Sequence, residues 1–171
     1  MEKSCYVKIL KPKNCAIKSI HKDRLISIGK VQTVLCERDI LMRATHTFII
    51  SLKFAFQTSA KFYLGLEYAS GGELFYRMQN EGALPLDDVR IYIAQLSLAL
   101  NYLHSLGIIY HDIKPENILL DSEGNIKLTD FGLAKDIIIH ERTSTMCGTP
   151  EYAAPEVVNQ HSYSYQVDCG L

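Results

Sequence analysis

The order of hydrophobic and polar positions predicts β-strands in the first part of the chain. Residues 5–10 and 15–20 are β-rich runs on either side of a Lys-Pro-Lys-Asn turn sequence, which favours a hairpin. Apolar residues then alternate with other residues over 50–56 and 62–68, which predicts a second pair of strands. Between the two pairs, residues 31–44 carry apolar side chains at helical spacing, so we expect an amphipathic helix there.

The pattern changes after Gly71 and Gly72, where helical spacing replaces alternation. Asp87 or Asp88 is expected to cap a long helix that ends at Gly107. The predicted core positions of this helix are Val89, Tyr92, Ile93, Leu96, Leu100 and Leu103. The change from sheet to helix predicts two lobes that are joined by a hinge.

The chain beyond this helix is predicted to form two short strands and a long loop. Residues 118–120 and 126–128 are short apolar runs around a Ser-Glu-Gly-Asn turn. From 131 to 155 there is little periodicity, which indicates a loop. Loops of that length in compact domains are usually functional or disordered.

Composition and charge are those of an ordinary globular protein. Of the 171 residues, 47% are hydrophobic and 22% are charged, with 18 Lys and Arg against 19 Asp and Glu. The net charge of -1 gives no general electrostatic reason to expect a nucleic-acid partner. No apolar run approaches the roughly 18 residues that cross a bilayer, so no membrane span is expected. These properties leave the oligomeric state open.

The five cysteines are scattered, without a C-x-x-C pair. This spacing argues against a zinc site or a disulfide framework and indicates a reduced intracellular chain. Because the N-terminus also lacks a secretory apolar region, we expect a cytoplasmic or nuclear location, or both.

Candidate chemistry lies in residues 110–117 (Tyr-His-Asp-Ile-Lys-Pro-Glu-Asn) and 130–132 (Asp-Phe-Gly). Mg²⁺ prefers oxygen ligands, and it is commonly held by one or two protein groups together with substrate phosphates. Phosphoryl transfer needs such a metal, a cation near the phosphates and a carboxylate that accepts the proton of the attacking hydroxyl. Each residue alone is more commonly a turn or cap residue, but their joint spacing favours a phosphoryl-transfer site.

These segments resemble the signature set of eukaryotic protein kinases. Residues 110–117 match H-R-D-x-x-x-x-N, 130–132 match D-F-G and 154–156 match A-P-E. Cys15-Ala16-Ile17-Lys18 matches V-A-I-K, and Glu37 matches the helical partner of that lysine.

Local sequence narrows the resemblance further. Leu66-Glu67-Tyr68-Ala69-Ser70-Gly71-Gly72-Glu73 and Cys147-Gly148-Thr149-Pro150-Glu151-Tyr152 are similar to the AGC group of kinases. Within that group the chain most resembles the ribosomal protein S6 kinases, with protein kinase B next.

The resemblance implies a serine/threonine protein kinase that uses ATP and Mg²⁺. Lys18 would pair with the α- and β-phosphates and be held by Glu37, while Asp112 would be the base and Lys114 a second phosphate cation. Mg²⁺ would be held by Asn117 and Asp130. The rest of the ATP site would consist of Ala16 and Leu119 on the two faces of adenine, Leu66 as gatekeeper, the backbone of Glu67 and Ala69 at the adenine edge, and Glu73 at the ribose.

The resemblance also implies partners and regulation. Glu73 and Glu116 match positions that contact substrate arginines, which implies protein substrates with basic residues near the Ser or Thr. Thr145 matches the activation-loop threonine that an upstream kinase phosphorylates, and Thr149 matches a residue that braces Asp112 and Lys114. A stacked hydrophobic column that links the lobes would consist of Leu41, Leu52, Tyr110 and Phe131.

Three features of the sequence depart from the family pattern. No glycine precedes Gly29, so the Gly-rich loop that approaches phosphate is missing, and we expect weaker ATP binding. His111 replaces the arginine of H-R-D, with Lys135 as a partial substitute. Asp168 matches the start of the central helix of the large lobe, but Cys169 replaces the expected tryptophan and the sequence stops two residues later.

The predicted fold is therefore α+β, a two-lobed protein-kinase-like fold that is incomplete at both ends. We assign residues 1–68 to a small β lobe with one helix, 69–73 to a hinge and 74–171 to a mainly helical large lobe. The alternative to an active kinase is a catalytically weak or inactive kinase fragment that acts as a binding or competitor module.

Overall fold

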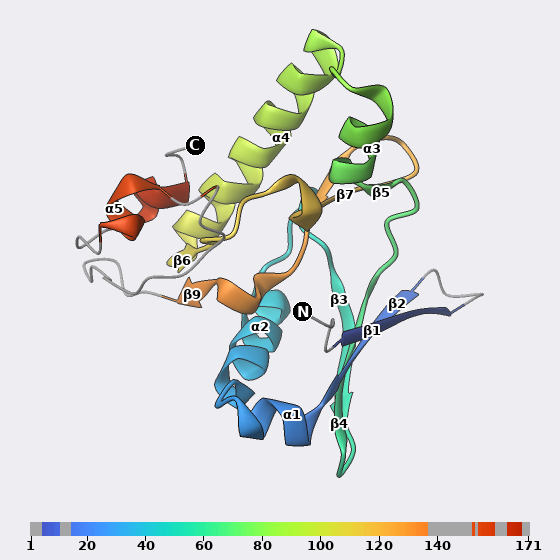
Figure 1. Ribbon diagram of the computed structural model, residues 1–171, viewed down its shortest axis with the longest axis vertical. Helices are drawn as coiled ribbons and strands as arrows, with labels where there is room; N and C mark the ends of the chain where they lie inside the picture. The colour runs from blue at the N-terminus through green and yellow to red at the C-terminus, as the bar shows by residue number, and fades with distance from the viewer. Residues whose placement is uncertain (1–4, 11–14, 137–151, 153, 160–163, 169–171) are drawn as a thin grey trace.

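A sheet-rich part and a helix-rich part make up the computed structural model, which describes residues 5–10, 15–136, 152, 154–159 and 164–168 (Figure 1). The first part contains a four-stranded antiparallel sheet in the order β1-β2-β4-β3. Its strands are β1 (Cys5–Leu10), β2 (Cys15–His21), β3 (Leu52–Gln57) and β4 (Lys61–Glu67). Both predicted strand pairs are confirmed.

Two helices lie beside this sheet. The predicted helix is confirmed as α2 (Val31–Arg43), which buries Val34, Glu37, Ile40 and Leu41. The preceding helix α1 (Lys22–Ser27) was not predicted. With six residues and one buried side chain, Leu25, it is too short to show a helical period.

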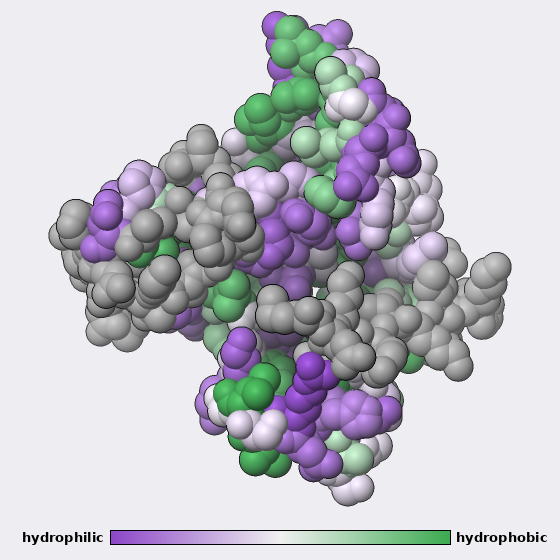
Figure 2. Space-filling view, in the orientation of Figure 1, coloured by the Kyte–Doolittle hydropathy of each residue, from purple (hydrophilic) through white to green (hydrophobic). Residues whose placement is uncertain are grey.

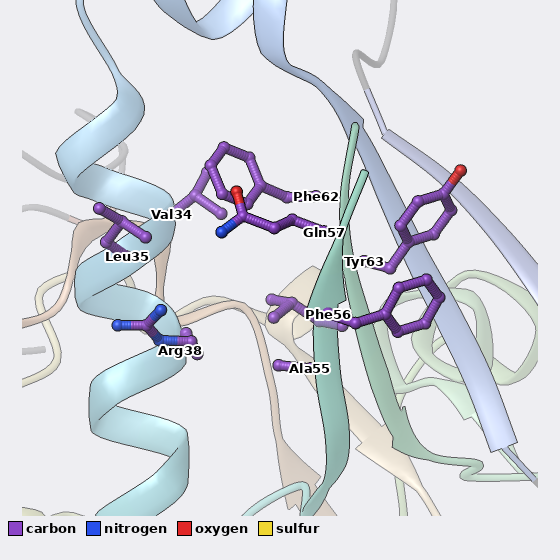
Figure 3. Close-up of a pocket in the computed structure, with 9 residues that line it drawn as sticks. Val34, Leu35, Arg38, Ala55, Phe56, Gln57, Phe62 and Tyr63 are labelled. Atoms are coloured by element: carbon purple, nitrogen blue, oxygen red, sulfur yellow. The ribbon is translucent and has the colours of Figure 1, made fainter. Parts of the chain in front are cut away.

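Aromatic rings are stacked on the outer face of the sheet, away from α2. The ring centroids of Phe56 and Tyr63 are 4.7 Å apart, and those of Phe54 and Phe56 are 6.1 Å apart. Figure 3 shows the rings of Phe56 and Tyr63 on the side of the strands opposite the helix. Phe56 is 51% exposed. Alternation therefore predicted the strand correctly, but its aromatic face lies outside the core because α2 covers the other face.

The helix-rich part is built around α4 (Leu86–Ser105), with α3 (Leu74–Glu81) beside its start (Figure 1). At the other end of α4, the ring of Tyr165 lies 5.0 Å from that of His104. Sheets of order β5-β7-β8 and β6-β9 complete this part. The remaining elements are β5 (Gly72–Glu73), β6 (Ile108–Ile109), η1 (Pro115–Asn117), β7 (Ile118–Leu120), β8 (Ile126–Leu128), η2 (Phe131–Leu133), β9 (Lys135–Asp136), α5 (Pro155–Val158) and η4 (Tyr165–Asp168).

The details of α4 correct the sequence prediction. Its N-cap residue is Pro85, so Asp87 and Asp88 lie in the first turn, where their charge faces the positive end of the helix dipole. Ile93 is 60% exposed rather than part of the core. Gly107 ends the helix as predicted, with a φ of 78° that glycine adopts without steric cost.

The predicted loop after residue 131 is wrong for its first residues, which form η2 and β9. Among the described residues, no helix has both the length and the apolar character needed to cross a bilayer. The architecture is α+β with two lobes, as predicted, whereas the exact lobe boundaries stay a prediction.

One hydrophobic cluster extends through both lobes and contains Leu41, Tyr110 and Phe131, with Leu52 packed against it. Backbone hydrogen bonds join the lobes at the same place. The N–H of Ile50 donates to the carbonyl of Leu128 (2.9 Å), and the N–H of Leu128 donates to the carbonyl of Phe48 (2.8 Å). The loop 48–50 is thus bonded to β8 of the large lobe.

Candidate active site

The segment that carries the candidate chemistry runs from β6 to β7 and is anchored by Asp168. The side chain of Asp168 is buried and accepts the backbone N–H groups of Tyr110 and His111, each at 2.8 Å. His104 Nε2 lies 2.9 Å from the same carboxylate. The sequence indicated Asp168 only as the start of a helix; its role as an anchor has no local signal, because its partners are distant along the chain.

His111 lies in the left-handed region of backbone conformation, with a φ of 70°. Such values are uncommon for residues other than glycine. Burial lowers the pKa of its side chain, and the positive charge of Lys135 lowers it further, against the opposing effect of Asp168. The histidine therefore favours its neutral form.

Asp112, Lys114 and Asn117 are brought together on this segment. Lys114 Nζ lies 2.8 Å from Asp112 Oδ2. Asn117 Nδ2 donates to the same oxygen at 2.7 Å and to the backbone carbonyl of Asp112 at 2.8 Å. Because η1 begins with a proline and places Asn117 one turn after Lys114, the tight turn brings the amide back to the carboxylate. The Asp112 carboxylate is thus buried but held by a cation and an amide.

A second group joins the two lobes through Lys18. Its Nζ lies 2.7 Å from Glu37 Oε1 on α2 and 3.1 Å from Asp130 Oδ1. The expected Lys18–Glu37 ion pair is therefore present. Burial raises the pKa of Glu37, and the charge of Lys18 offsets this only in part. Burial also acts to raise the pKa of Asp130, but Lys18 and the N–H of Gly132 lower it overall, which favours the carboxylate.

The residues expected around adenine lie where the two lobes meet. Ala16 is opposite Leu66 in the pairing of β2 with β4, and Leu119 is opposite Glu73 in the pairing of β5 with β7. Glu67 ends β4, and the buried Ala69 follows it. Figure 2 shows polar residues gathered in the middle of this view, between the helical part and the sheet.

The remaining predicted residues are two threonines of the activation loop and the second arginine-contacting carboxylate, Glu116. Thr145 and Thr149 lie outside the described residues. Glu116 has a buried Oε2 atom with no hydrogen-bond partner among the residues that the structure describes. An incoming cationic group would satisfy that oxygen.

The donor set suits Mg²⁺ in part. No cluster of three or more His, Cys, Asp or Glu side chains that could hold a metal occurs in the described ranges. Asp130 and Asn117 offer a carboxylate and an amide oxygen, which matches the small number of protein ligands that Mg²⁺ takes when phosphate supplies the others. The residues present therefore fit a metal that arrives with a nucleotide.

A separate pocket lies between α2 and the sheet (Figure 3). Its volume is about 130 Å³, and none of the predicted site residues that the structure describes line it. The side chains of Val34, Leu35 and Arg38 face this space from the helix. The pocket is thus next to the helix that carries Glu37, but it is distinct from the candidate active site.

Comparison with known proteins adds the family. The protein kinase domain model matches residues 4–169. The chain is 52% identical over 154 residues to ribosomal protein S6 kinase alpha-3 of Homo sapiens, and this alignment covers 90% of this chain and 21% of that protein. It is 49% identical over 165 residues to ribosomal protein S6 kinase alpha-1 of Rattus norvegicus, and this alignment covers 94% of this chain and 22% of that protein.

The chain thus spans about a fifth of the length of the curated relatives it matches. The family match nevertheless extends over almost every residue and includes both halves of the candidate active site. The chain belongs to the protein kinase family, with the ribosomal protein S6 kinases among its relatives.

Proposed function

We propose that the chain is an ATP-dependent serine/threonine protein kinase. The observation that carries this proposal is a pair of neighbouring groups, Lys18 with Glu37 and Asp130, and Asp112 with Lys114 and Asn117. The two groups are close enough for the charge of Lys114 to lower the pKa of Asp130. The first group supplies a fixed cation that bridges the lobes, and the second supplies a carboxylate beside a cation. Phosphoryl transfer depends mainly on such positioning and charge stabilisation.

In the proposed reaction, the hydroxyl oxygen of a Ser or Thr bonds to the γ-phosphorus of ATP as the bond to the β,γ-bridging oxygen breaks. Asp112 accepts the hydroxyl proton, and ADP leaves with the bridging oxygen. Lys18 and Lys114 stabilise the charge on the phosphates, while Glu37 keeps Lys18 in place. Asn117 and Asp130 would hold Mg²⁺, which supplies further charge neutralisation at the phosphates when bound.

The proposed substrates are proteins with basic residues near the phosphorylated Ser or Thr. The buried Oε2 atom of Glu116, which has no hydrogen-bond partner in the described part of the chain, supports this, because an arginine of the substrate would pair with it. Glu73 is the second carboxylate that we propose for this recognition. We also propose that an upstream kinase activates the chain through Thr145.

A phosphorylation assay with an Asp112→Asn variant tests the function. With Mg²⁺, ATP and an arginine-containing Ser/Thr peptide, the wild type should transfer phosphate at least about 100-fold faster than this variant, because loss of a general base typically costs that much or more. Asp87→Asn, an equal change on the exposed start of α4, should match the wild type. Equal incorporation by the wild type and Asp112→Asn would contradict the proposal and favour the alternative of a binding or competitor module.

A further inference from the structure

Lys127 is a buried lysine with no role in the chemistry described above. It lies on β8, its side chain is 11% exposed, and its Nζ is 2.9 Å from Oε1 of Glu67. Lysine is almost never buried unless it is paired. A largely buried ion pair adds little net stability to the folded state. We therefore look to the Lys127–Glu67 pair for a role in positioning the segments that carry these two residues.

Glu67 is fixed at three points. Its N–H donates to the carbonyl of Ser51 at 2.8 Å, and its Oε2 accepts the N–H of Ser51 at 3.2 Å. Its Oε1 pairs with Lys127. Burial acts to raise the pKa of Glu67, but the hydrogen bond and charge of Lys127, together with the hydrogen bonds from Ser51, lower it overall. The last residue of β4 is therefore held by both its backbone and its side chain.

The position of Lys127 connects this residue to the floor of the proposed nucleotide site. Lys127 is opposite Leu119 in the pairing of β7 with β8, so both side chains project from one face of that sheet. The next residue, Leu128, is bonded through its backbone to the loop 48–50. Lys127 adds a direct side-chain link from β8 to the last residue of β4, just before the hinge.

We propose that Lys127 is a positioning residue for the nucleotide. Through Glu67 it sets the distance between residues 67–69, where β4 leads into the hinge, and Leu119, so that the backbone of these residues and the Leu119 side chain contact the same adenine. This inference rests on the proposed function. It adds that adenine affinity depends on an ion pair whose side chains do not contact the nucleotide.

Calorimetric titration of the full chain with ATP tests this role. Lys127→Met should weaken the ATP Kd roughly five- to tenfold, in line with couplings between contacting residues. Lys127→Arg should restore much of the affinity because it keeps the charge. Glu67→Gln keeps the backbone at the end of β4 and should weaken binding similarly, and the double variant should lose little more than either single one. Lys53→Met removes an exposed lysine from β3 and is the matched control.

Two further measurements separate positioning from folding. Kinase assays should show a raised KM for ATP with little change in kcat, since an interaction that is equal in ground and transition states is lost. Melting curves without nucleotide identify a temperature at which every variant is folded, and the titrations are made there. A role in stability alone would lower the melting temperature and leave the ATP Kd unchanged.

The outcomes distinguish this inference from the function on which it rests. If the wild type binds ATP and Lys127→Met binds it equally well, the inference is wrong and the proposed function stands. An arginine variant as weak as the methionine variant would also overturn it, because charge would then not matter. If the wild type does not bind ATP at all, the proposed function is contradicted and this inference fails with it.

Discussion

The backbone at His111 is held independently of its side chain. Its N–H donates to the buried Asp168, so a change of side chain leaves the segment that carries Asp112 anchored. Burial keeps the imidazole mostly neutral near pH 7, whereas an arginine would carry a permanent charge and two parallel donors. We therefore expect a histidine at position 111 to form a weaker contact than an arginine with the phosphate that we propose for Thr145.

We expect His111→Arg to raise the activity of Thr145-phosphorylated protein and to make activity depend more strongly on that phosphorylation. The gain should be roughly tenfold, because one added charge-assisted hydrogen bond contributes about 1.5 kcal/mol or more. Peptide phosphorylation by both forms, before and after phosphatase treatment, measures it. His21→Arg, an equal change at an exposed position, should have no effect. Identical activity in the phosphorylated wild type and His111→Arg would contradict the prediction.

The lowered pKa of His111 also predicts loss of stability in acid. The unfolded histidine titrates near 6.5, above the folded value, so the unfolded chain binds more protons as the pH falls below about 6.5. The free energy of unfolding should therefore decrease from pH 7.5 to pH 5.5, lowering the melting temperature by roughly 2–4 °C. His111→Asn does not titrate and tolerates the left-handed backbone, so its melting temperature should fall less. Equal losses in both proteins would rule this explanation out.

Where β5 meets β7, Gly71 packs tightly against the backbone of Leu120 and Asp121. A Cβ atom at Gly71 would lie 2.9 Å from the carbonyl oxygens of Leu120 and Asp121. At Gly65 the close atoms belong instead to the tip of the Phe54 ring, which is 39% exposed and free to turn outward. A ring can move at small cost, whereas a paired strand cannot.

Gly71→Ala should therefore reduce the free energy of unfolding by about 2 kcal/mol, and Gly65→Ala by about 1 kcal/mol or less. Urea denaturation with a two-state fit compares the two variants. In a Phe54→Ala background, the cost of Gly65→Ala should disappear, since nothing then opposes the new methyl group. A larger loss for Gly65→Ala than for Gly71→Ala would show that this reading of the two contacts is wrong.

The long elements with a clear period were predicted, namely strands β1 to β4 and helices α2 and α4. The three-residue strands β7 and β8 were also predicted, because their apolar runs lie on either side of a turn sequence. The two-residue strands β5, β6 and β9 cannot show a period, and helices α1 and α3, with six and eight residues, were not predicted because they span only about two turns or fewer. The cap of α4 was also mispredicted, since Pro85 precedes the aspartates that were expected to cap it.

The residues of the candidate site also fall into those that the sequence predicted and those that it did not. Asp112, Lys114 and Asn117 are close in sequence, so their spacing predicted a cluster, and family resemblance added Lys18 and Glu37. The anchor Asp168 and the Lys127–Glu67 pair depend on contacts between segments far apart in the chain. No local pattern distinguishes such residues from ordinary charged ones.

At the scale of the whole molecule, nucleotide binding should be visible as a gain in stability. A ligand that binds only the folded state stabilises it by about 2.7 kcal/mol at 100 times its Kd. For a chain of this size, Mg·ATP should raise the melting temperature by roughly 5–10 °C. EDTA should reduce the shift, because no metal held by Asp130 and Asn117 would then offset the repulsion between the phosphates and the Asp130 carboxylate.

Lys18→Met should abolish most of this shift, whereas Lys53→Met should leave it intact. The comparison isolates the lysine that bridges the lobes from an exposed lysine of the same sheet. An unchanged melting temperature of the wild type in millimolar Mg·ATP would contradict the proposed nucleotide site.

The bonds between the loop 48–50 and β8 have a mechanical consequence for α2. The loop follows α2 directly, and the N–H of Thr45 also donates to the hydroxyl of Tyr102 on α4 at 3.0 Å. The C-terminal end of α2 is therefore bonded to the large lobe, while Val34 near its N-terminal end packs with Ile20 and Leu25 of the small lobe. We expect a rotation of α2 about its C-terminal end, near Ala44, to change the distance between Glu37 and Lys18.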